Sequence, residues 1–203
     1  MSVSIFGISA TRGTLLALRQ QLGFIKKGKE ILEMKRDRLA GEINKLLSQI
    51  NIRMEVDEKF NNVYRHFLDV LIRRGFEQIK SISNSISNIK IDIKKYSVMG
   101  VEVVKLSIVD EPNINAIPDP LIQSFASQLY EAFKLLLKST EIEVNTEAIA
   151  LELMSTSRKV NSLEKIVIPM YEELIHYVEE RLLEEAIEEF SRTKYIAERR
   201  GRE

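Results

Sequence analysis

The chain has 203 residues, of which 30% are charged and 7% are aromatic, a composition typical of extended, solvated helices rather than of a large globular core. It contains no cysteine, which excludes disulfide bonds and cysteine zinc clusters and favours a reducing compartment. The net charge is zero and no uncharged apolar stretch approaches the ~20 residues needed to cross a bilayer, so we expect no direct insertion into a membrane.

An apolar repeat with spacings of three and four residues predicts one long N-terminal helix over residues 11–80. Nine of its first eleven positions are Leu or Ile: Leu15, Leu18, Leu22, Ile25, Lys29, Leu32, Arg36, Leu39, Ile43, Leu46 and Ile50. So narrow a stripe is typical of a coiled-coil seam. The repeat continues less regularly through Phe60, Tyr64, Phe67 and Leu71.

The pattern changes in the central region, residues 81–118. Ile91 and Ile93 alternate with charged residues, and a turn candidate at residues 97–100 separates them from Val101 and Val103, which predicts a short β-hairpin. The isoleucines from Ile79 to Ile89 also fit a helical period, so a helix remains an alternative there. The proline-rich residues 110–120 are predicted to form a loop.

A second long helix is predicted over residues 119–200, with Asp119 as its N-cap and Pro120 as its first residue. Pro169 lacks an N–H group and is expected to bend this helix locally. The second seam consists of Leu153, Thr156, Val160, Leu163, Val167, Met170, Leu174 and Tyr177.

The charges at the two ends of the chain are complementary. Residues 12–53 contain ten basic and four acidic residues, whereas residues 160–189 contain two basic and nine acidic residues. This asymmetry favours the two ends lying side by side. The predicted fold is therefore mainly all-α: a long antiparallel two-helix coiled coil with a small central hairpin and loop as its head.

Motifs that suggest chemistry have simpler explanations in this chain. The stretch from Gly23 to Glu30 matches the spacing of a phosphate loop, but Glu30 replaces the required Ser or Thr and the glycines lie inside the heptad repeat. Gly23 and Gly28 are better explained by close helix approach or slight flexibility. His66 and His176 have no second His or Cys at a ligand spacing, and the paired glutamates form a charged helix face. We expect no catalytic site, no cofactor and no metal.

Three parts of the sequence resemble the D subunit of A-type (archaeal-type) and V-type (vacuolar-type) rotary ATPases. The N-terminal part is the pattern from Thr11-Arg12 through Gly28 to Leu39, and the central part is the turn at residues 98–101. The C-terminal part runs from Arg158 through Pro169 and Tyr177 into the acidic segment, with Lys159 and Ser162 departing from the usual Arg and Ala.

The resemblance implies a non-catalytic central-stalk rotor, or shaft, of a complex for ATP synthesis and ion transport. Its two chain ends would insert into a hexamer of A and B subunits. A small F subunit would bind along the coiled coil, and a C subunit would link the shaft to the proteolipid ring. H⁺ or Na⁺ would drive the ring, and the rotor would lie peripherally on the cytoplasmic side of the cell membrane.

In that complex, charged side chains are predicted to contact the A/B hexamer. These candidate contact residues are Arg12, Arg19, Lys26, Lys27, Glu179, Glu180, Glu184 and Glu185. Two other classes of protein fit the helices. One is a free-standing coiled-coil adaptor or scaffold, which would self-associate. The other is a helical hairpin that binds nucleic acid through a basic band, which consists of Lys26, Lys27, Lys29, Lys35, Arg36 and Arg38. The acidic C-terminal segment favours a protein-facing surface over binding to nucleic acid.

Overall fold

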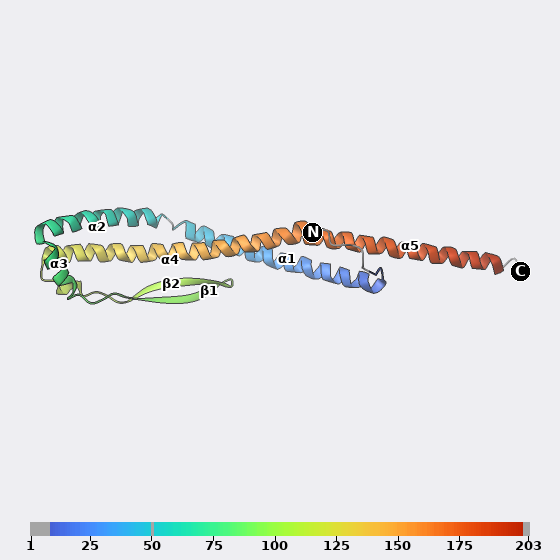
Figure 1. Cartoon of the computed structure of the whole chain (residues 1–203), viewed down its shortest axis with the longest axis horizontal. Coiled ribbons are helices and arrows are strands. Elements are labelled where there is room, and N and C mark those ends of the chain that lie inside the picture. Colours follow the sequence, from blue (N-terminus) through green and yellow to red (C-terminus); the bar gives the residue numbers. More distant parts are fainter. Residues whose placement is uncertain (1–8, 50, 201–203) are drawn as a thin grey trace. The chain divides into compact units, whose positions relative to one another are not determined.

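The structure, a computed structural model, describes residues 9–49 and 51–200. In this part of the chain most residues are helical, and one two-stranded antiparallel sheet follows the first three helices (Figure 1). The predicted class is therefore confirmed. The elements are α1 (Arg12–Leu47), α2 (Ile52–Arg74), α3 (Phe76–Ser83), β1 (Lys90–Val98), β2 (Val101–Asp110), a 3₁₀ turn (Ile114–Ala116), α4 (Pro120–Ser162), a π-helical segment (Leu163–Val167) and α5 (Ile168–Arg200).

The helical stretch predicted over residues 11–80 is divided into three helices. Helix α1 ends at Leu47, and α2 begins at Ile52. The last position of the predicted first seam, Ile50, lies outside the described residues. Gly75 separates α2 from α3 with a φ of 76°, a left-handed conformation that residues other than glycine rarely adopt. None of the helices in the described part is long and apolar enough to cross a bilayer.

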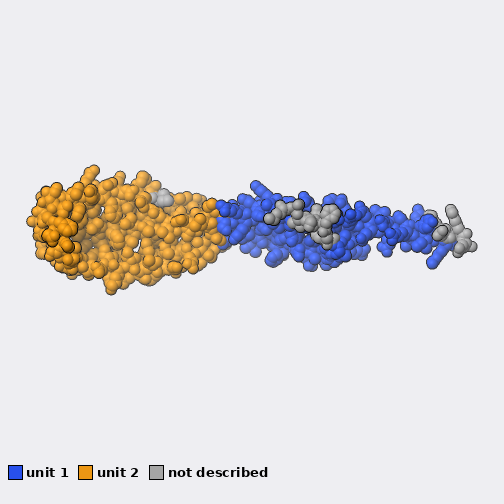
Figure 2. Space-filling view, viewed as in Figure 1, with its two compact units in different colours: residues 1–36, 155–203 blue, residues 37–154 orange. Residues whose placement is uncertain are grey.

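The chain forms two compact units, coloured separately in Figure 2. The first, called the terminal unit, combines residues 1–36 with residues 155–203. The second, called the central unit, comprises residues 37–154 and contains the hairpin. The terminal unit thus joins segments from opposite ends of the sequence.

In the terminal unit, the start of α1 packs against α5. Leu18, Leu174 and Val178 form the buried centre of this contact, and Leu15 and Leu182 extend it. Salt bridges join Arg19 to Glu179 and Lys26 to Glu172, so a later residue of α1 meets an earlier residue of α5 and the helices run antiparallel. The ends of the chain therefore pair as their apolar repeats and opposite charges predict.

The helix around Pro169 is not a regular α-helix. Residues Leu163–Val167 form a π-helical turn, and the Ile168 N–H bonds to the Leu163 carbonyl, five residues back. Pro169 follows immediately and has no N–H to donate to the carbonyl four residues before it. The predicted interruption is present, as an irregular turn that ends at the proline.

In the central unit, the hairpin packs against both long helices. Leu39 of α1, Ile149 of α4, and Val101 and Val103 of β2 form one buried cluster. Strand β2 is also hydrogen-bonded to α4: the Val104 N–H donates to Asn145 Oδ1 and Asn145 Nδ2 donates to the Val104 carbonyl, both at 2.8 Å. The side chain of Asn145 thus replaces a neighbouring strand along this edge.

The hairpin itself is longer than predicted. Its two-residue turn consists of Met99 and Gly100, with φ values of 54° and 82°. Two consecutive positive φ angles match the right-handed twist of the strands that such a turn connects. Of the alternative helical interpretation, only the segment Phe76–Ser83 is α-helical.

Near its start, α4 is held by the N-cap that the sequence predicts. The helix begins at Pro120, and Asp119 Oδ1 accepts a hydrogen bond from the Leu121 N–H at 3.0 Å. The same carboxylate accepts from Arg74 of α2, with 2.7 Å between Nε and Oδ2. Beside this junction, Val70, Ile117 and Ile122 form the second buried cluster of the central unit.

Candidate functional site

The described part of the chain contains no group of three or more His, Cys, Asp or Glu side chains that could hold a metal ion. The residues with phosphate-loop spacing, Gly23 to Glu30, are part of α1, so their N–H groups belong to a helix and not to an anion-binding loop. Beyond the backbone of α1 itself, no atom lies within 4 Å of where a Cβ on Gly23 or Gly28 would be. Close helix approach therefore does not explain these two glycines. The candidate site is instead a set of helix surfaces.

Three salt bridges link the basic start of the chain to its acidic end within the terminal unit. They join Arg19 to Glu179 at 2.6 Å, Lys26 to Glu172 at 2.8 Å and Lys29 to Glu164 at 3.1 Å. The hydrogen bond from Lys29 to Glu164 raises the pKa of the Lys29 ammonium above its ordinary value. All three pairs are partly exposed, so solvent screens them and their contribution to stability is small. These salt bridges therefore contribute more to the alignment of α1 and α5 than to the stability of the helix pair.

The eight candidate contact residues occupy different surroundings. Arg19, Lys26 and Glu179 take part in the salt bridges between α1 and α5. On α5, Glu180 lies 3.2 Å from His176, and Glu184 lies 3.0 Å from Arg181. The remaining side chains are exposed; they are Arg12, Lys27 and Glu185.

An apolar stripe lies on the C-terminal part of α5, where sequence reasoning saw only a charged face. Leu183, Ile187 and Phe190, called here the α5 stripe, are spaced by four and three residues and so share one side of the helix. Phe190 is 71% exposed. Leu182 is the last residue of α5 that packs on the core shared with α1, so the stripe follows directly after that core. The four–three spacing is visible in the sequence, but the adjacent glutamates obscured it.

A second stripe lies on the exposed side of α2. Its members recur every fourth residue, and Ile72 is 83% exposed. These residues, called the α2 stripe, are Tyr64, Leu68 and Ile72. The sequence-based assignment of Tyr64 to the seam is wrong, because a heptad of valines faces the core instead: Val56, Val63 and Val70 are buried.

Beside α3, an apolar hollow of about 340 Å³ opens in the central unit. Its walls combine α2, α3 and the start of α4 with the segment that leads out of β2. They include Phe60, Ile82, Ile86, Pro112 and Phe125. Almost no polar surface lines the hollow, so it offers apolar contacts and few groups that could form hydrogen bonds.

Comparison with known proteins gives these helix surfaces their context. The sequence profile of the ATP synthase D subunit matches residues 14–198, nearly the whole chain. The chain belongs to the ATP synthase D-subunit family.

Among members of this family, the A-type ATP synthase D subunit of Methanobrevibacter smithii is 32% identical, over 95% of this chain and 87% of its own length. The V-type ATP synthase D subunit of Thermotoga neapolitana is 31% identical, over 96% of this chain and 99% of its own length. The A-type ATP synthase D subunit of Thermococcus gammatolerans is 26% identical, over 95% of this chain and 94% of its own length. The chain is therefore similar to these relatives along most of their length and not in one motif alone. The family resemblance seen in the sequence is confirmed.

Proposed function

We propose that this D subunit is the central-stalk rotor of its ATP synthase and transmits torque without taking part in the chemistry. The observation that carries the proposal is the pairing of the two chain ends in the terminal unit, followed by the exposed α5 stripe. A shaft inside a bearing needs a stiff core of paired helices and an outer surface that partners contact reversibly. The buried seam of Leu18, Leu174 and Val178 supports the first need, and the mixed apolar and acidic surface of α5 supports the second.

We assign the end of the terminal unit to the A/B hexamer. The α5 stripe supplies apolar contact area, and each buried side chain of this size contributes about 1.5–3 kcal/mol. Arg12, Lys27 and Glu185, which are exposed, supply electrostatic contacts that are weaker and are screened by salt. On this proposal, apolar burial provides the affinity and the charges set the approach and the orientation.

The central unit faces the membrane ring in this proposal. The α2 stripe and the apolar hollow lie near the middle of the sequence, and we assign them to the C subunit, the link to the proteolipid ring. The F subunit is expected to bind along the exposed surface of the paired helices. The rotor then lies on the cytoplasmic side, and its contact with the membrane is made through the C subunit. The coupling ion, H⁺ or Na⁺, acts on the ring and needs no site in this chain.

Co-purification from source membranes tests the proposal. An affinity-tagged copy of the full chain is expected to bring down the A, B, C and F subunits in a constant ratio, and crosslinks are expected from the α5 stripe to A or B. A chain that instead self-associates and lacks these partners would support the free-standing adaptor. Binding to nucleic acid that falls steeply as salt rises would support the nucleic-acid alternative.

A further inference from the structure

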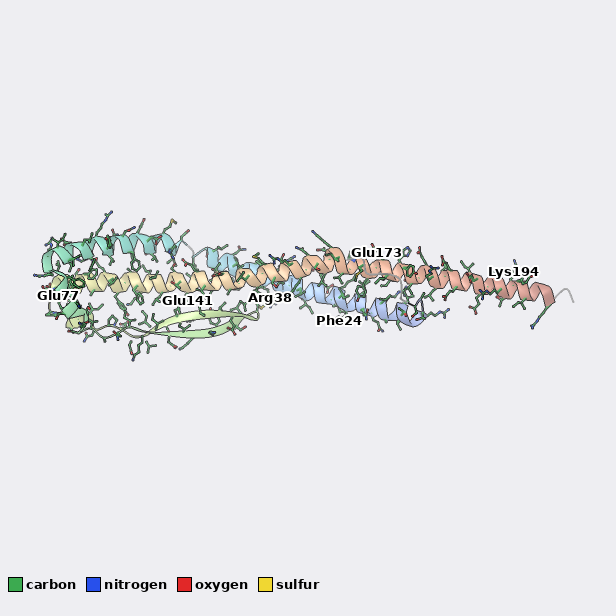
Figure 3. The ribbon with its side chains drawn as sticks, viewed as in Figure 1. Phe24, Arg38, Glu77, Glu141, Glu173 and Lys194 are labelled. Atoms are coloured by element: carbon green, nitrogen blue, oxygen red, sulfur yellow. The ribbon has the colours of Figure 1, made fainter. Side chains whose placement is uncertain are left out.

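The two edges of the hairpin are in different states. On the β2 edge, Val104 bonds to Asn145 through both its N–H and its carbonyl, and the Leu106 N–H donates to Glu141 Oε2 at 2.9 Å. Glu141 is labelled on α4 in Figure 3, close to the hairpin. Side chains of α4 therefore occupy the edge that would otherwise accept another strand.

The register shows where the equivalent groups of β1 point. Hydrogen-bonded and non-hydrogen-bonded pairs alternate along an antiparallel ladder, and residues of a non-hydrogen-bonded pair direct their N–H and C=O groups away from each other. Val104 is opposite Lys95 and Leu106 is opposite Ile93. Since Val104 and Leu106 bond outward to α4, Lys95 and Ile93 direct their own backbone groups outward from the other edge. In the described part of the chain, the sheet consists of β1 and β2 alone.

The side chains along β1 leave room for another strand. Ile93 is 60% exposed, and Ile91 and Tyr96 are also exposed. Ile91 and Ile93 are two residues apart and share one face of the sheet with Leu106 and Ile108, their partners across the ladder. A strand beside β1 would therefore gain apolar contacts on this face by placing β-branched residues next to the two isoleucines.

The charges of β1 define the chemistry of the partner. The strand carries three lysines and one acidic residue, Asp92. Lys90 and Lys95 form salt bridges with Asp110 and Glu102 of β2, at 2.8 and 3.7 Å, so Lys94 is the lysine whose nearest neighbour across the ladder is another cation. Lys94 lies directly opposite Lys105 across the ladder, and like charges in that position are destabilising. The Lys94 ammonium forms a salt bridge with Asp92 on its own strand, at a long distance of 3.7 Å. A carboxylate from a third strand beside Lys94 would relieve the repulsion from Lys105.

We propose that the outer edge of β1 binds an extended acidic segment of a partner protein as a third strand, with acidic residues beside Lys94 and β-branched residues beside Ile91 and Ile93. Backbone hydrogen bonds at Ile93 and Lys95 provide the attachment, and the alternating side chains provide selectivity. Lysines on an edge strand also oppose pairing between two copies of the same strand. They thus select against a second copy of this chain and for an acidic partner. This inference does not depend on the rotor role.

The test is an NMR titration of the full chain with a blocked peptide as long as β1, in which glutamate and valine alternate. Binding is expected to slow amide hydrogen exchange at Ile93 and Lys95, while the Lys94 amide, which already faces β2, changes little. A peptide of alternating lysine and valine is expected not to bind. If the Ile93 and Lys95 amides stay unprotected at peptide excess, or if both peptides bind equally, the proposal is overturned.

Two variants separate the backbone from the charge. Lys95→Pro removes the outward N–H but no backbone hydrogen bond between the two strands. It is expected to weaken peptide binding about tenfold more than Lys95→Ala, which removes the same salt bridge to Glu102 but keeps the N–H. Lys94→Glu is expected to weaken peptide binding about tenfold, because a negative charge replaces the cation beside the peptide's carboxylates.

Lys159→Glu makes the same change in charge outside the hairpin and is expected to alter affinity less than about twofold. Equal losses in Lys94→Glu and Lys159→Glu would contradict a contact at β1. Dimerisation that protects the Ile93 and Lys95 amides without peptide would overturn the acidic partner in favour of a second copy of the chain.

Discussion

Asn145 illustrates how a single residue positions an element of this fold. Its amide is buried, with 5% of the residue exposed, and it bonds both backbone groups of Val104. Asparagine suits this position because its side chain carries a donor and an acceptor in the same arrangement as a peptide group. No feature of the sequence near Asn145 identifies this role, because Val104 lies 41 residues away.

Asn145→Asp is expected to loosen the hairpin, because a carboxylate loses the donor and faces the Val104 carbonyl as a second acceptor. The cost is expected to be about 2–3 kcal/mol of unfolding free energy. Hydrogen exchange of the β2 amides measures the loosening of the hairpin, and urea unfolding measures the loss of unfolding free energy. Asn61→Asp on the exposed side of α2 makes the same chemical change, and its expected effect is below about 0.5 kcal/mol. Equal effects of the two variants would show that Asn145 does not hold the hairpin.

Gly23→Ala is expected to stabilise the chain by about 0.5–1 kcal/mol, because glycine lowers helix stability and an added Cβ has open space around it. Gly100→Ala is expected to destabilise the chain, because a φ of 82° strains any residue with a Cβ. Thermal unfolding of both variants gives the signs of the two changes. A Gly23→Ala variant that unfolds at a lower temperature would reveal a packing or flexibility role for this glycine.

At the scale of the helix pair, burial outweighs charge. The salt bridges between α1 and α5 are partly exposed, whereas Val178 is fully buried with Leu18 and Leu174. An exposed ion pair contributes at most about 1 kcal/mol, and a buried aliphatic side chain contributes about 1.5–3 kcal/mol. The antiparallel alignment can therefore be set by charge while its stability comes from the seam.

Val178→Ala is expected to cost about 1–2.5 kcal/mol, since it removes two buried methyl groups and leaves a small cavity. A tenfold rise in salt concentration, which screens the three salt bridges, is expected to cost less than this substitution. Urea unfolding at low and high salt, with and without the substitution, makes the comparison. If salt had the larger effect, the ion pairs and not the seam would hold the helices together.

The hairpin turn is a second element whose stability depends on local conformation. Met99 has a φ of 54°, and a residue other than Gly, Asn or Asp has a steric cost of about 1–2 kcal/mol there. Met99→Asn creates an Asn-Gly turn and is expected to stabilise the hairpin by about 1 kcal/mol. Slower exchange of the β1 and β2 amides would measure the gain. Unchanged exchange would mean that contacts of the Met99 side chain offset the strain.

At the scale of the whole molecule, exposed apolar residues gather on two separate helix faces, the α5 stripe and the α2 stripe. Both stripes stay exposed among the described residues, and scattered single apolar residues would not recur at helical spacing. Two such faces suit a subunit that joins two other components of a complex. These two faces add to the support for the proposed rotor role, which rests first on the pairing of the chain ends.

Phe190→Ser is expected to weaken binding to the A/B hexamer about tenfold or more, because a buried aromatic contact is worth at least about 1.4 kcal/mol. Met54→Ser on α2 removes an apolar side chain of similar exposure and serves as the matched control. Affinity for the purified hexamer is the measurement, with helicity checked by circular dichroism. Equal affinities of the two variants would remove the α5 stripe from the interface.

The residues differ in how far their positions could be anticipated. The apolar repeats mark positions that are buried, such as Leu18, Leu39 and Val160, because period and burial are linked along any amphipathic helix. The position of Tyr64 could not be anticipated in this way. Two apolar stripes on α2 could face the core, and only the packing of the folded chain shows that the valines do so. The charge asymmetry indicates that the two ends attract each other, but not that Arg19 pairs with Glu179.

The sequence by itself determined the mainly helical class, the Asp119 cap, the position of the hairpin and the family, but not the breaks that divide residues 11–80 into three helices. Each feature that it determined depends on residues close together in the chain or on their order along it. Only the tertiary structure decided which edge of the hairpin α4 covers, which charges pair and which apolar faces stay exposed. Those features depend on residues that are distant in sequence, and many pairings satisfy the same local pattern. Packing in three dimensions selects one of them.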